Sequence, residues 1–141
     1  MASNLSGLTI KDEHLRRALE GQEYLLVDGA MGTQMQKRGL DALEAVPELL
    51  CKTHADDITA IHAAYIAAGA EVITTNTFSA NRLKLGDKMS VEEAYRRAAD
   101  CARRAGAPYI AGDIGPTGSL LEPMGTLSFD EAYDIFAEQV R

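Results

Sequence analysis

Three polar residues in this sequence each follow a short apolar run. Asp28, Asn76 and Asp113 each come seven positions after a glycine. The glycines are Gly21, Gly69 and Gly106. A glycine commonly ends a helix, and polar residues at the ends of strands lie where α/β folds bind ligands. Two carboxylates can hold an ammonium group, and an amide can both donate and accept hydrogen bonds. The spacing therefore indicates a site for an amino-acid-like ligand.

The residues after Asp28 add a candidate site for the anionic end of such a ligand. Gly29 and Gly32 stand at the expected start of a helix, where free N–H groups can hold a carboxylate. A phosphate loop is the weaker alternative, because the segment lacks the P-loop lysine and the full dinucleotide glycine pattern. The structural alternative is that Asp28 and Asn76 only cap the turns that follow them.

Cysteine and histidine residues are less informative. Cys51 and His54 are three positions apart and His62 follows eight later, but a fourth metal ligand is missing and the histidines fall at different angles on a helix. We expect surface or core roles for these three, a core role for Cys101, and a solvated helix position for His14.

Strand and helix patterns alternate along the chain. We expect strands at 24–27, 72–75 and 109–111, and helices at 10–20, 31–38, 53–68, 90–105 and from the Ser128 cap onward, with N-caps at Asp12, Thr53, Ser90 and Ser128. The loops are expected at 40–52 and 77–89, each with a helical turn, and at 112–126. Apolar faces are expected at Ile58, Ile61, Tyr65 and Ala68, at Val91, Ala94, Ala98, Cys101 and Ala105, and at Ala132, Ile135, Phe136 and Val140. This order favours parallel strands joined by right-handed helical crossovers.

Composition narrows the class of protein. A chain of 141 residues has the length of one domain, and its net charge of −7 argues against nucleic acid or an anionic membrane as the main partner. No apolar run is long enough to span a bilayer, and the first ten residues lack the features of a signal peptide. Two cysteines without a spaced framework fit a cytoplasmic setting.

Four segments resemble the homocysteine S-methyltransferase family. They are Asp28-Gly-Ala-Met-Gly-Thr-Gln, Ala68-Gly-Ala-Glu-Val-Ile-Thr-Thr-Asn-Thr-Phe, Gly112-Asp-Ile-Gly-Pro-Thr-Gly and Leu120-Leu-Glu-Pro-Met-Gly-Thr-Leu-Ser-Phe-Asp-Glu-Ala-Tyr. The last is similar to the N-terminal module of cobalamin-dependent methionine synthases in particular. The resemblance covers nearly the whole chain from Glu23 onward.

The resemblance implies an α/β fold that is part of a (β/α)8 TIM barrel, with about three parallel strands, their helices and an N-terminal capping helix. Residues 1–22 would hold the capping helix, and residues 23–141 the truncated first part of a homocysteine-binding barrel. It also implies methyl transfer to the thiol of homocysteine, giving methionine. Methylcobalamin is the expected donor, re-methylated from methyltetrahydrofolate on other modules, although relatives also use S-methylmethionine or betaine.

The resemblance further implies which residues touch homocysteine. The expected substrate-binding residues are Asp28, Gly29, Met31, Asn76, Thr77, Phe78, Asp113 and Gly115. Family members hold zinc through three cysteines on later strands, which would lie past Arg141, so we expect no metal ligand in this chain and no turnover by it alone. Methionine synthases also tend to show an asparagine and a proline where this chain has Cys51 and Ala55. The resemblance leaves the catalytic residues unassigned.

Two other functions stay open at this point. One is a non-catalytic half-barrel that associates with itself through open sheet edges, since three strands are too few to close a barrel. The other is an α/β module that binds a small molecule or phosphate.

Overall fold

The computed structural model describes residues 7, 9–40, 42–44 and 46–141. Positions 1–6 and 8 of the expected N-terminal segment, and positions 41 and 45 of the expected loop, lie outside the described residues. The helices are α1 (Glu13–Leu19), α2 (Met31–Lys37), α3 (Leu50–Thr53), α4 (Ala55–Ala67), α5 (Arg82–Leu85), α6 (Val91–Arg104) and α7 (Phe129–Val140), with a 3₁₀ helix η1 (Pro47–Leu49) and strands β1 (Val72–Thr74) and β2 (Tyr109–Ala111).

The two strands form a parallel sheet in which Ile73 lies opposite Ile110. The prediction of a full strand at 24–27 is wrong, because within that run only Val27 forms a bridge, parallel to Val72. The backbone N–H groups of Glu71 and Val72 do donate to the carbonyl of Leu26, at 2.8 and 3.1 Å. However, the N–H of Leu26 donates to the Glu71 carboxylate at 3.2 Å instead of to a neighbouring backbone. The parallel ladder therefore stops after one bridge.

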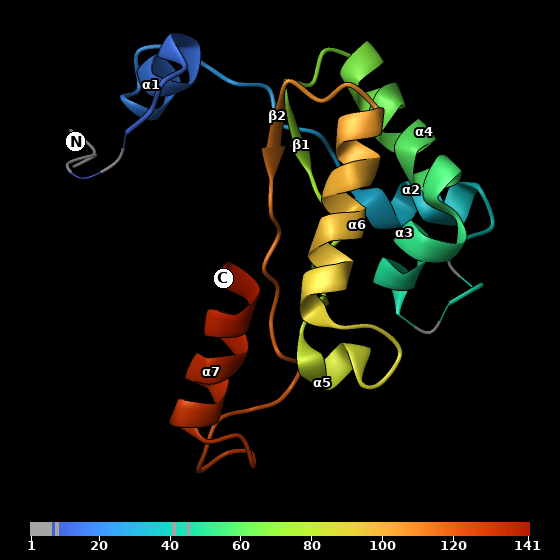
Figure 1. The fold of residues 1–141 in the computed structure, drawn as a ribbon, viewed down its shortest axis with the longest axis vertical. Coiled ribbons are helices and arrows are strands. Elements are labelled where there is room, and N and C mark those ends of the chain that lie inside the picture. Colours follow the sequence, from blue (N-terminus) through green and yellow to red (C-terminus); the bar gives the residue numbers. More distant parts are fainter. Residues whose placement is uncertain (1–6, 8, 41, 45) are drawn as a thin grey trace.

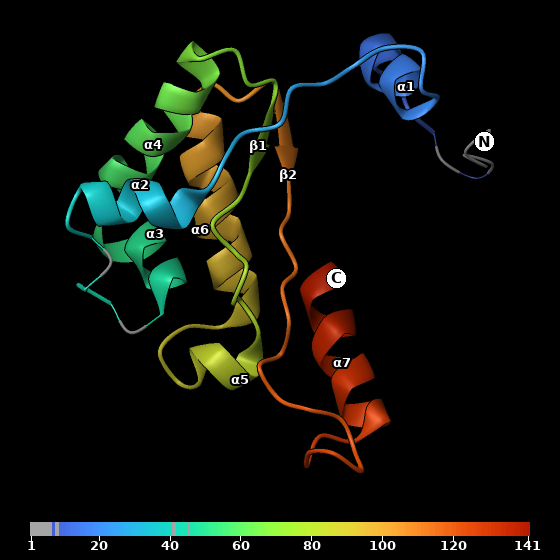
Figure 2. The same cartoon turned by 180° about the vertical axis from the view of Figure 1, so that it is seen from behind.

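Helices cover one face of this sheet. Helices α4 and α6 pack against each other and against β1 and β2, while α2 and α3 lie outside them (Figures 1 and 2). Their shared core contains Met35, Leu40, Leu50, Cys51, Ile58, Ile61, Ala98 and Cys101. Helix α6 buries four of the five residues of its predicted apolar face, Val91, Ala94, Ala98 and Cys101, because apolar burial is the main force that holds such a helix in place. The fifth, Ala105, lies past the end of the helix and is only partly buried, and Ala102 is buried instead.

Two other helices differ from their predicted faces. In α4, His62 is fully buried although it was not expected on the apolar face, and Ala68, which was expected there, is exposed. In α7 the buried residues include Gln139, whereas Val140 is 74% exposed. Helix α7 packs on the other described elements mainly through α6, so only a narrow side of it is covered.

Most predicted helix starts are confirmed. The side chains of Asp12, Ser90 and Ser128 each accept a backbone N–H in the first turn of the helix that follows. The prediction for Thr53 is wrong, because this residue ends α3 and its hydroxyl donates to the carbonyl of Leu49. The loop expected at 40–52 holds two short helical segments, η1 and α3, rather than one turn.

Helix α1 is joined to the sheet by side-chain hydrogen bonds. His14 lies in α1 with its side chain 39% exposed, as expected for a solvated helix position, and it also contacts Glu23 at 2.5 Å and Glu71 at 3.0 Å. The hydroxyl of Tyr109 donates to Asp12 at 2.8 Å. The bonds from Glu23 and then Glu71 raise the pKa of His14 above its ordinary value.

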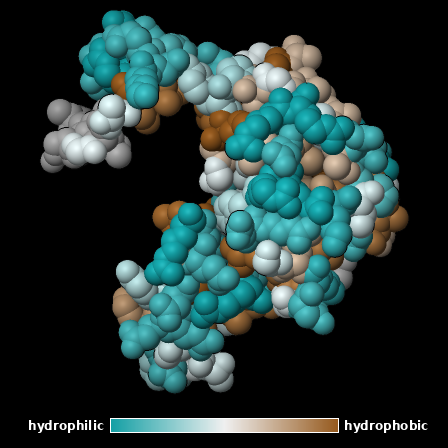
Figure 3. Space-filling model, viewed as in Figure 1, coloured by the Kyte–Doolittle hydropathy of each residue, from teal (hydrophilic) through white to brown (hydrophobic). Residues whose placement is uncertain are grey.

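The sheet face away from the helices is open. The space-filling view shows a notch between α1 and α7 with apolar surface along its border (Figure 3). Large exposed apolar residues of the described chain include Tyr24, Leu26, Val27, Ile110, Ile114, Leu120 and Leu121. None of the helices in the described part of the chain is long and apolar enough to cross a membrane.

Candidate functional site

A cavity of about 190 Å³ lies where the strands end. It is lined by Asp28, Gly29, Ala30, Met31, Thr74, Thr75, Asn76, Phe78 and Asp113. The carboxyl ends of β1 and β2 and the segment before α2 all contribute to it, because parallel strands place their exits at one edge of a sheet. The cavity is smaller than the sites that hold drug-sized ligands, which are about 300–1,000 Å³.

Asp28 joins the first segment to β1 at the floor of the cavity. Its backbone N–H donates to the carbonyl of Val72 at 3.0 Å, and its Oδ2 accepts the N–H of Thr74 at 3.0 Å. One carboxylate oxygen is thereby held in place. Asp28 therefore acts as a structural link between the segments and also lines the cavity.

Gly29 is needed at its position for packing. A Cβ atom there would lie 3.0 Å from two atoms of the Tyr65 side chain, Cε1 and the hydroxyl oxygen. The same hydroxyl donates to the carbonyl of Ala30 at 3.0 Å, which fixes the turn into α2. The glycine lets α4 approach this turn closely.

Asp113 is fixed through its backbone. Its carbonyl accepts hydrogen bonds from the hydroxyls of Thr77 and Tyr95, each at 2.8 Å. Its N–H faces the Thr77 hydroxyl oxygen at 3.1 Å and that of Thr75 at 3.3 Å. Because the backbone is held on both sides, the side chain is carried to a defined place beside the cavity.

Asn76 is 6% exposed and lines the cavity from β1. Its amide nitrogen donates to the carbonyl of Pro47 at 2.9 Å and contacts the sulfur of Cys51 at 3.7 Å. The residues around η1 therefore orient this amide, although sequence reasoning treated that stretch only as a loop.

Gly115 supports the cavity from behind. A Cβ atom there would lie 2.2 Å from the carbonyl oxygen of Phe78, closer than real atoms approach. Phe78 itself is 57% exposed at the rim. The glycine thus permits the loop after β2 to lie directly on the loop after β1.

Two buried ionisable groups lie near the cavity. Burial is the main cause that raises the pKa of Glu48, and the N–H of Ser79 that it accepts at 2.5 Å opposes the shift. Burial also lowers the pKa of His62, against the influence of Asp28. Both ring nitrogens of His62 and one oxygen of Glu48 are buried without a hydrogen-bond partner.

The structure brings most of the predicted residues together. Those that line the cavity are Asp28, Gly29, Met31, Asn76, Phe78 and Asp113. Thr77 and Gly115 are buried behind it, where they hold Asp113 and Phe78. Three further residues, Ala30, Thr74 and Thr75, line the cavity beside predicted ones. They were not predicted, although extending each motif by one or two positions would have included them.

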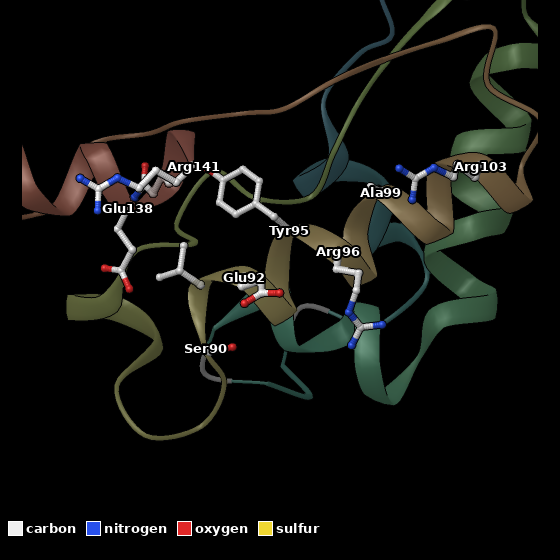
Figure 4. Close-up of a pocket in the computed structure, with 10 residues that line it drawn as sticks. Ser90, Glu92, Tyr95, Arg96, Ala99, Arg103, Glu138 and Arg141 are labelled. Atoms are coloured by element: carbon white, nitrogen blue, oxygen red, sulfur yellow. The ribbon is translucent and has the colours of Figure 1, made fainter.

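A larger hollow of about 690 Å³ lies elsewhere, between α6 and α7 (Figure 4). Charged side chains of both signs line it, including Glu92, Arg96, Arg103 and Glu138. Three of these groups also pair with neighbours: Arg96 and Arg103 with Asp100, at 3.9 and 2.8 Å, and Glu138 with Arg82 at 3.3 Å. We place the candidate site in the smaller cavity, because that is where the strands end and the polar side chains converge.

Comparison with known proteins decides the family. A sequence model of the family described as homocysteine S-methyltransferase matches residues 25–141. The chain belongs to the homocysteine S-methyltransferase family. This agrees with the resemblance carried by the segments that begin at Asp28, Ala68, Gly112 and Leu120.

Individual relatives support the same family. A methionine synthase of Mycobacterium tuberculosis is 32% identical over 151 residues, and one of Mycobacterium leprae is 32% identical over 133 residues. These alignments cover 93% and 83% of this chain but only 13% and 11% of the relatives. The chain therefore spans about an eighth of the length of the methionine synthases that it matches.

A solved homocysteine S-methyltransferase has a similar fold. The metallated form of the homocysteine methyltransferase MmuM from Escherichia coli superposes with a TM-score of 0.62 at 25% identity. The superposition covers 74% of this chain and 42% of that chain. The oxidized form of the same protein gives the same TM-score at 24% identity. The mixed α/β architecture with a parallel sheet is thus that of a homocysteine methyltransferase.

Proposed function

We propose that this chain forms the part of a homocysteine S-methyltransferase, of the methionine synthase type, that binds the amino-acid end of homocysteine. The observation that carries the proposal is the convergence of Asp28, Asn76 and Asp113 on one small cavity at the strand ends. Membership of the family and the likeness to methionine synthases support homocysteine as the substrate.

The chemistry of the cavity suits an amino acid. The carboxylates of Asp28 and Asp113 would attract the ammonium group, because charge-assisted hydrogen bonds are the stronger ones. Backbone N–H groups from Gly29 to Met31, at the start of α2, would donate hydrogen bonds to the carboxylate end. The volume of about 190 Å³ favours a small amino acid over a larger ligand. The thiol of the bound homocysteine would then lie beyond the residues that the structure describes.

We assign no metal step to this chain. Zinc, when bound in this family, would bring the substrate sulfur to its thiolate form at neutral pH. Among the described residues, no group of three or more His, Cys, Asp or Glu side chains could hold a metal ion. The residues that the structure does describe bind and orient the substrate. Methylcobalamin as the donor, and the modules that would re-methylate it, are part of the proposal for the whole protein.

We also propose that the sheet is the first part of a (β/α)8 barrel. The parallel order of the 26–28 segment, β1 and β2, with α4 and α6 packed on the same face, supports this arrangement (Figure 1). The superposition on 42% of a homocysteine methyltransferase supports it too. Helix α1 would close the end of the barrel away from the cavity and so serve as a capping helix outside the barrel.

The proposal is tested with the complete protein that carries this chain. Methionine formation is measured with homocysteine and, as matched controls, with homoserine and cysteine. We expect homocysteine alone to be methylated, because homoserine lacks the thiol and cysteine is one carbon shorter. Equal stabilisation of the fold by inorganic phosphate, without methionine formation, would instead favour a phosphate-binding module.

A self-associating half-barrel is the second candidate. The exposed Leu26, Val27 and Ile110 along the open sheet favour it, since uncovered strand edges promote association. Sedimentation of the 141-residue chain tests this directly. A compact dimer that unfolds cooperatively would support the half-barrel, and a monomer would argue against it.

A further inference from the structure

Cys51 and Cys101 lie next to each other although they are far apart in the sequence. Cys51 is in α3 and Cys101 is in α6, two helices that pack together. Both residues belong to the main apolar core, are 2% exposed and carry free thiols. Both also line one small hollow, and each thiol is the largest influence on the pKa of the other, a pairing that the sequence did not indicate.

The surroundings make the two sulfurs unequal. The hydrogen bond from Cys51 is the largest cause that lowers the pKa of Cys101, followed by the hydroxyl of Thr59 and the charge of Arg104. The same pairing, followed by burial, raises the pKa of Cys51. The Cys101 sulfur donates to the carbonyl of Ala55 at 3.7 Å, and its lowered pKa makes it the more readily deprotonated and more nucleophilic thiol of the two. The raised pKa of Cys51 keeps that thiol protonated.

A small reagent can reach the pair. A hollow of about 230 Å³ is lined by Cys51, Ala55, Arg96, Arg97, Asp100, Cys101 and Arg104. The charge of Arg104 favours a thiolate at Cys101, and the carboxylate of Asp100 opposes it. The hollow is distinct from the candidate substrate cavity, with which it shares no lining residue among those described.

We propose that Cys51 and Cys101 form a reversible disulfide when the protein meets hydrogen peroxide. The Cys101 thiol loses its proton, and the thiolate attacks one peroxide oxygen as the O–O bond breaks and Cys101 becomes a sulfenic acid. The hydroxide that leaves takes up the proton that Cys101 gave up and becomes the first water. The Cys51 sulfur then attacks the Cys101 sulfur, the S–O bond breaks, and the Cys51 proton leaves with that oxygen as water. Two thiols are oxidised and one peroxide is reduced to two waters. A small thiol restores the pair by exchange.

One residue, Asn76, contacts both the cysteine pair and the candidate substrate cavity. Asn76, which lines that cavity, donates to the Cys51 sulfur at 3.7 Å. A bond between the two sulfurs draws Cys51 toward α6 and weakens this contact. The formation of the disulfide itself does not rest on the proposed function, and its test does not involve homocysteine.

The test uses the complete protein, reduced, desalted and treated with a small excess of hydrogen peroxide. Digestion with trypsin without reductant, followed by mass spectrometry, should show peptides 39–52 and 98–103 linked to each other. Dithiothreitol should separate them. Persistence of both free thiols, or linkage of either cysteine to another partner, would overturn the proposal. This readout needs no variant and so does not depend on the folding of one.

Two matched variants test the roles of the sulfurs. In Cys51→Ser, Cys101 should stop at the sulfenic acid and be labelled by dimedone, whereas in Cys101→Ser the remaining Cys51 should stay a thiol. Circular dichroism of each reduced variant checks that the fold is kept. Equal dimedone labelling of both variants would contradict the assignment of Cys101 as the nucleophile.

Discussion

The hydroxyl of Thr77 donates to the backbone carbonyl of Asp113 at 2.8 Å, and so ties the exit of β1 to the exit of β2. Thr77 is fully buried, and its oxygen also faces the N–H of Asp113 at 3.1 Å. This pair explains how two loops that are distant in the sequence keep a carboxylate beside the cavity.

Removal of this link should destabilise the protein. Thr77→Val keeps the shape of the side chain but leaves buried polar groups of Asp113 without a partner. We expect a loss of about 1–3 kcal/mol in the free energy of unfolding, measured by urea denaturation. Thr33→Val in α2 is the control, because its hydroxyl is exposed to solvent and donates to the carbonyl of Ala30 at 3.3 Å. An equal, small loss in both variants would argue against a special role for Thr77.

The close approach of two loops predicts the effect of adding a methyl group. Gly115→Ala should lower the stability by about 1–3 kcal/mol, because the new Cβ would meet the carbonyl of Phe78 at 2.2 Å. Gly32→Ala is the matched control, since nothing lies within 4 Å of its Cβ position in α2, and alanine favours a helix. Thermal unfolding should show opposite shifts. A neutral Gly115→Ala would mean that the loops are not in contact.

The buried His62 predicts a dependence of stability on pH. Burial lowers its pKa in the folded state, so below the ordinary value of about 6.5 the unfolded chain binds a proton that the folded chain does not. The free energy of unfolding should therefore fall as pH decreases below about 6.5, and that of His62→Gln should fall less steeply. His14, whose raised pKa acts in the opposite direction, is present in both proteins and cancels in the comparison. Identical slopes in urea denaturation would contradict this.

The raised pKa of His14 predicts how α1 is attached. Its pairing with Glu23 and Glu71 should be complete below about pH 6.5 and be lost as pH rises through the higher pKa of the folded state. Hydrogen exchange of the amides of α1 should then speed up with pH by more than its intrinsic rise. His14→Gln should remove this additional dependence, and its persistence in that variant would exclude His14 as the cause.

The sequence predicted the elements of this fold well where local signals act alone. Ser90, Ser128 and Asp12 cap helices as expected, and Asn81 begins the short helix in the loop 77–89. The exits of the strands were found because glycine and polar residues mark them at equal spacing. These signals are local, and therefore a reader of the sequence can detect them.

The errors came from interactions between distant residues. The expected first strand is only one bridge long, because the N–H of Leu26 donates to the carboxylate of Glu71 and not to a strand backbone. Thr53 does not begin a helix, because it is the last residue of α3, which follows η1 directly. The pairing of Cys51 with Cys101 and the place of Thr77 behind Asp113 also depend on packing between helices and loops. No spacing within one segment could reveal them.

The most direct test of the account compares two ligands and two proteins. Isothermal titration of the complete protein measures the affinity for homocysteine and for 4-sulfanylbutanoate, which lacks the amino group, in the natural protein and in Asp28→Asn. If Asp28 holds the ammonium group, loss of that group should weaken binding to the natural protein by about 10- to 100-fold but should change binding to Asp28→Asn little. The account would be contradicted if Asp28→Asn weakened the affinity for homocysteine and for 4-sulfanylbutanoate by the same factor. It would also be contradicted if the variant bound both ligands as tightly as the natural protein. In either case the cavity would not be the site for the amino-acid end of homocysteine.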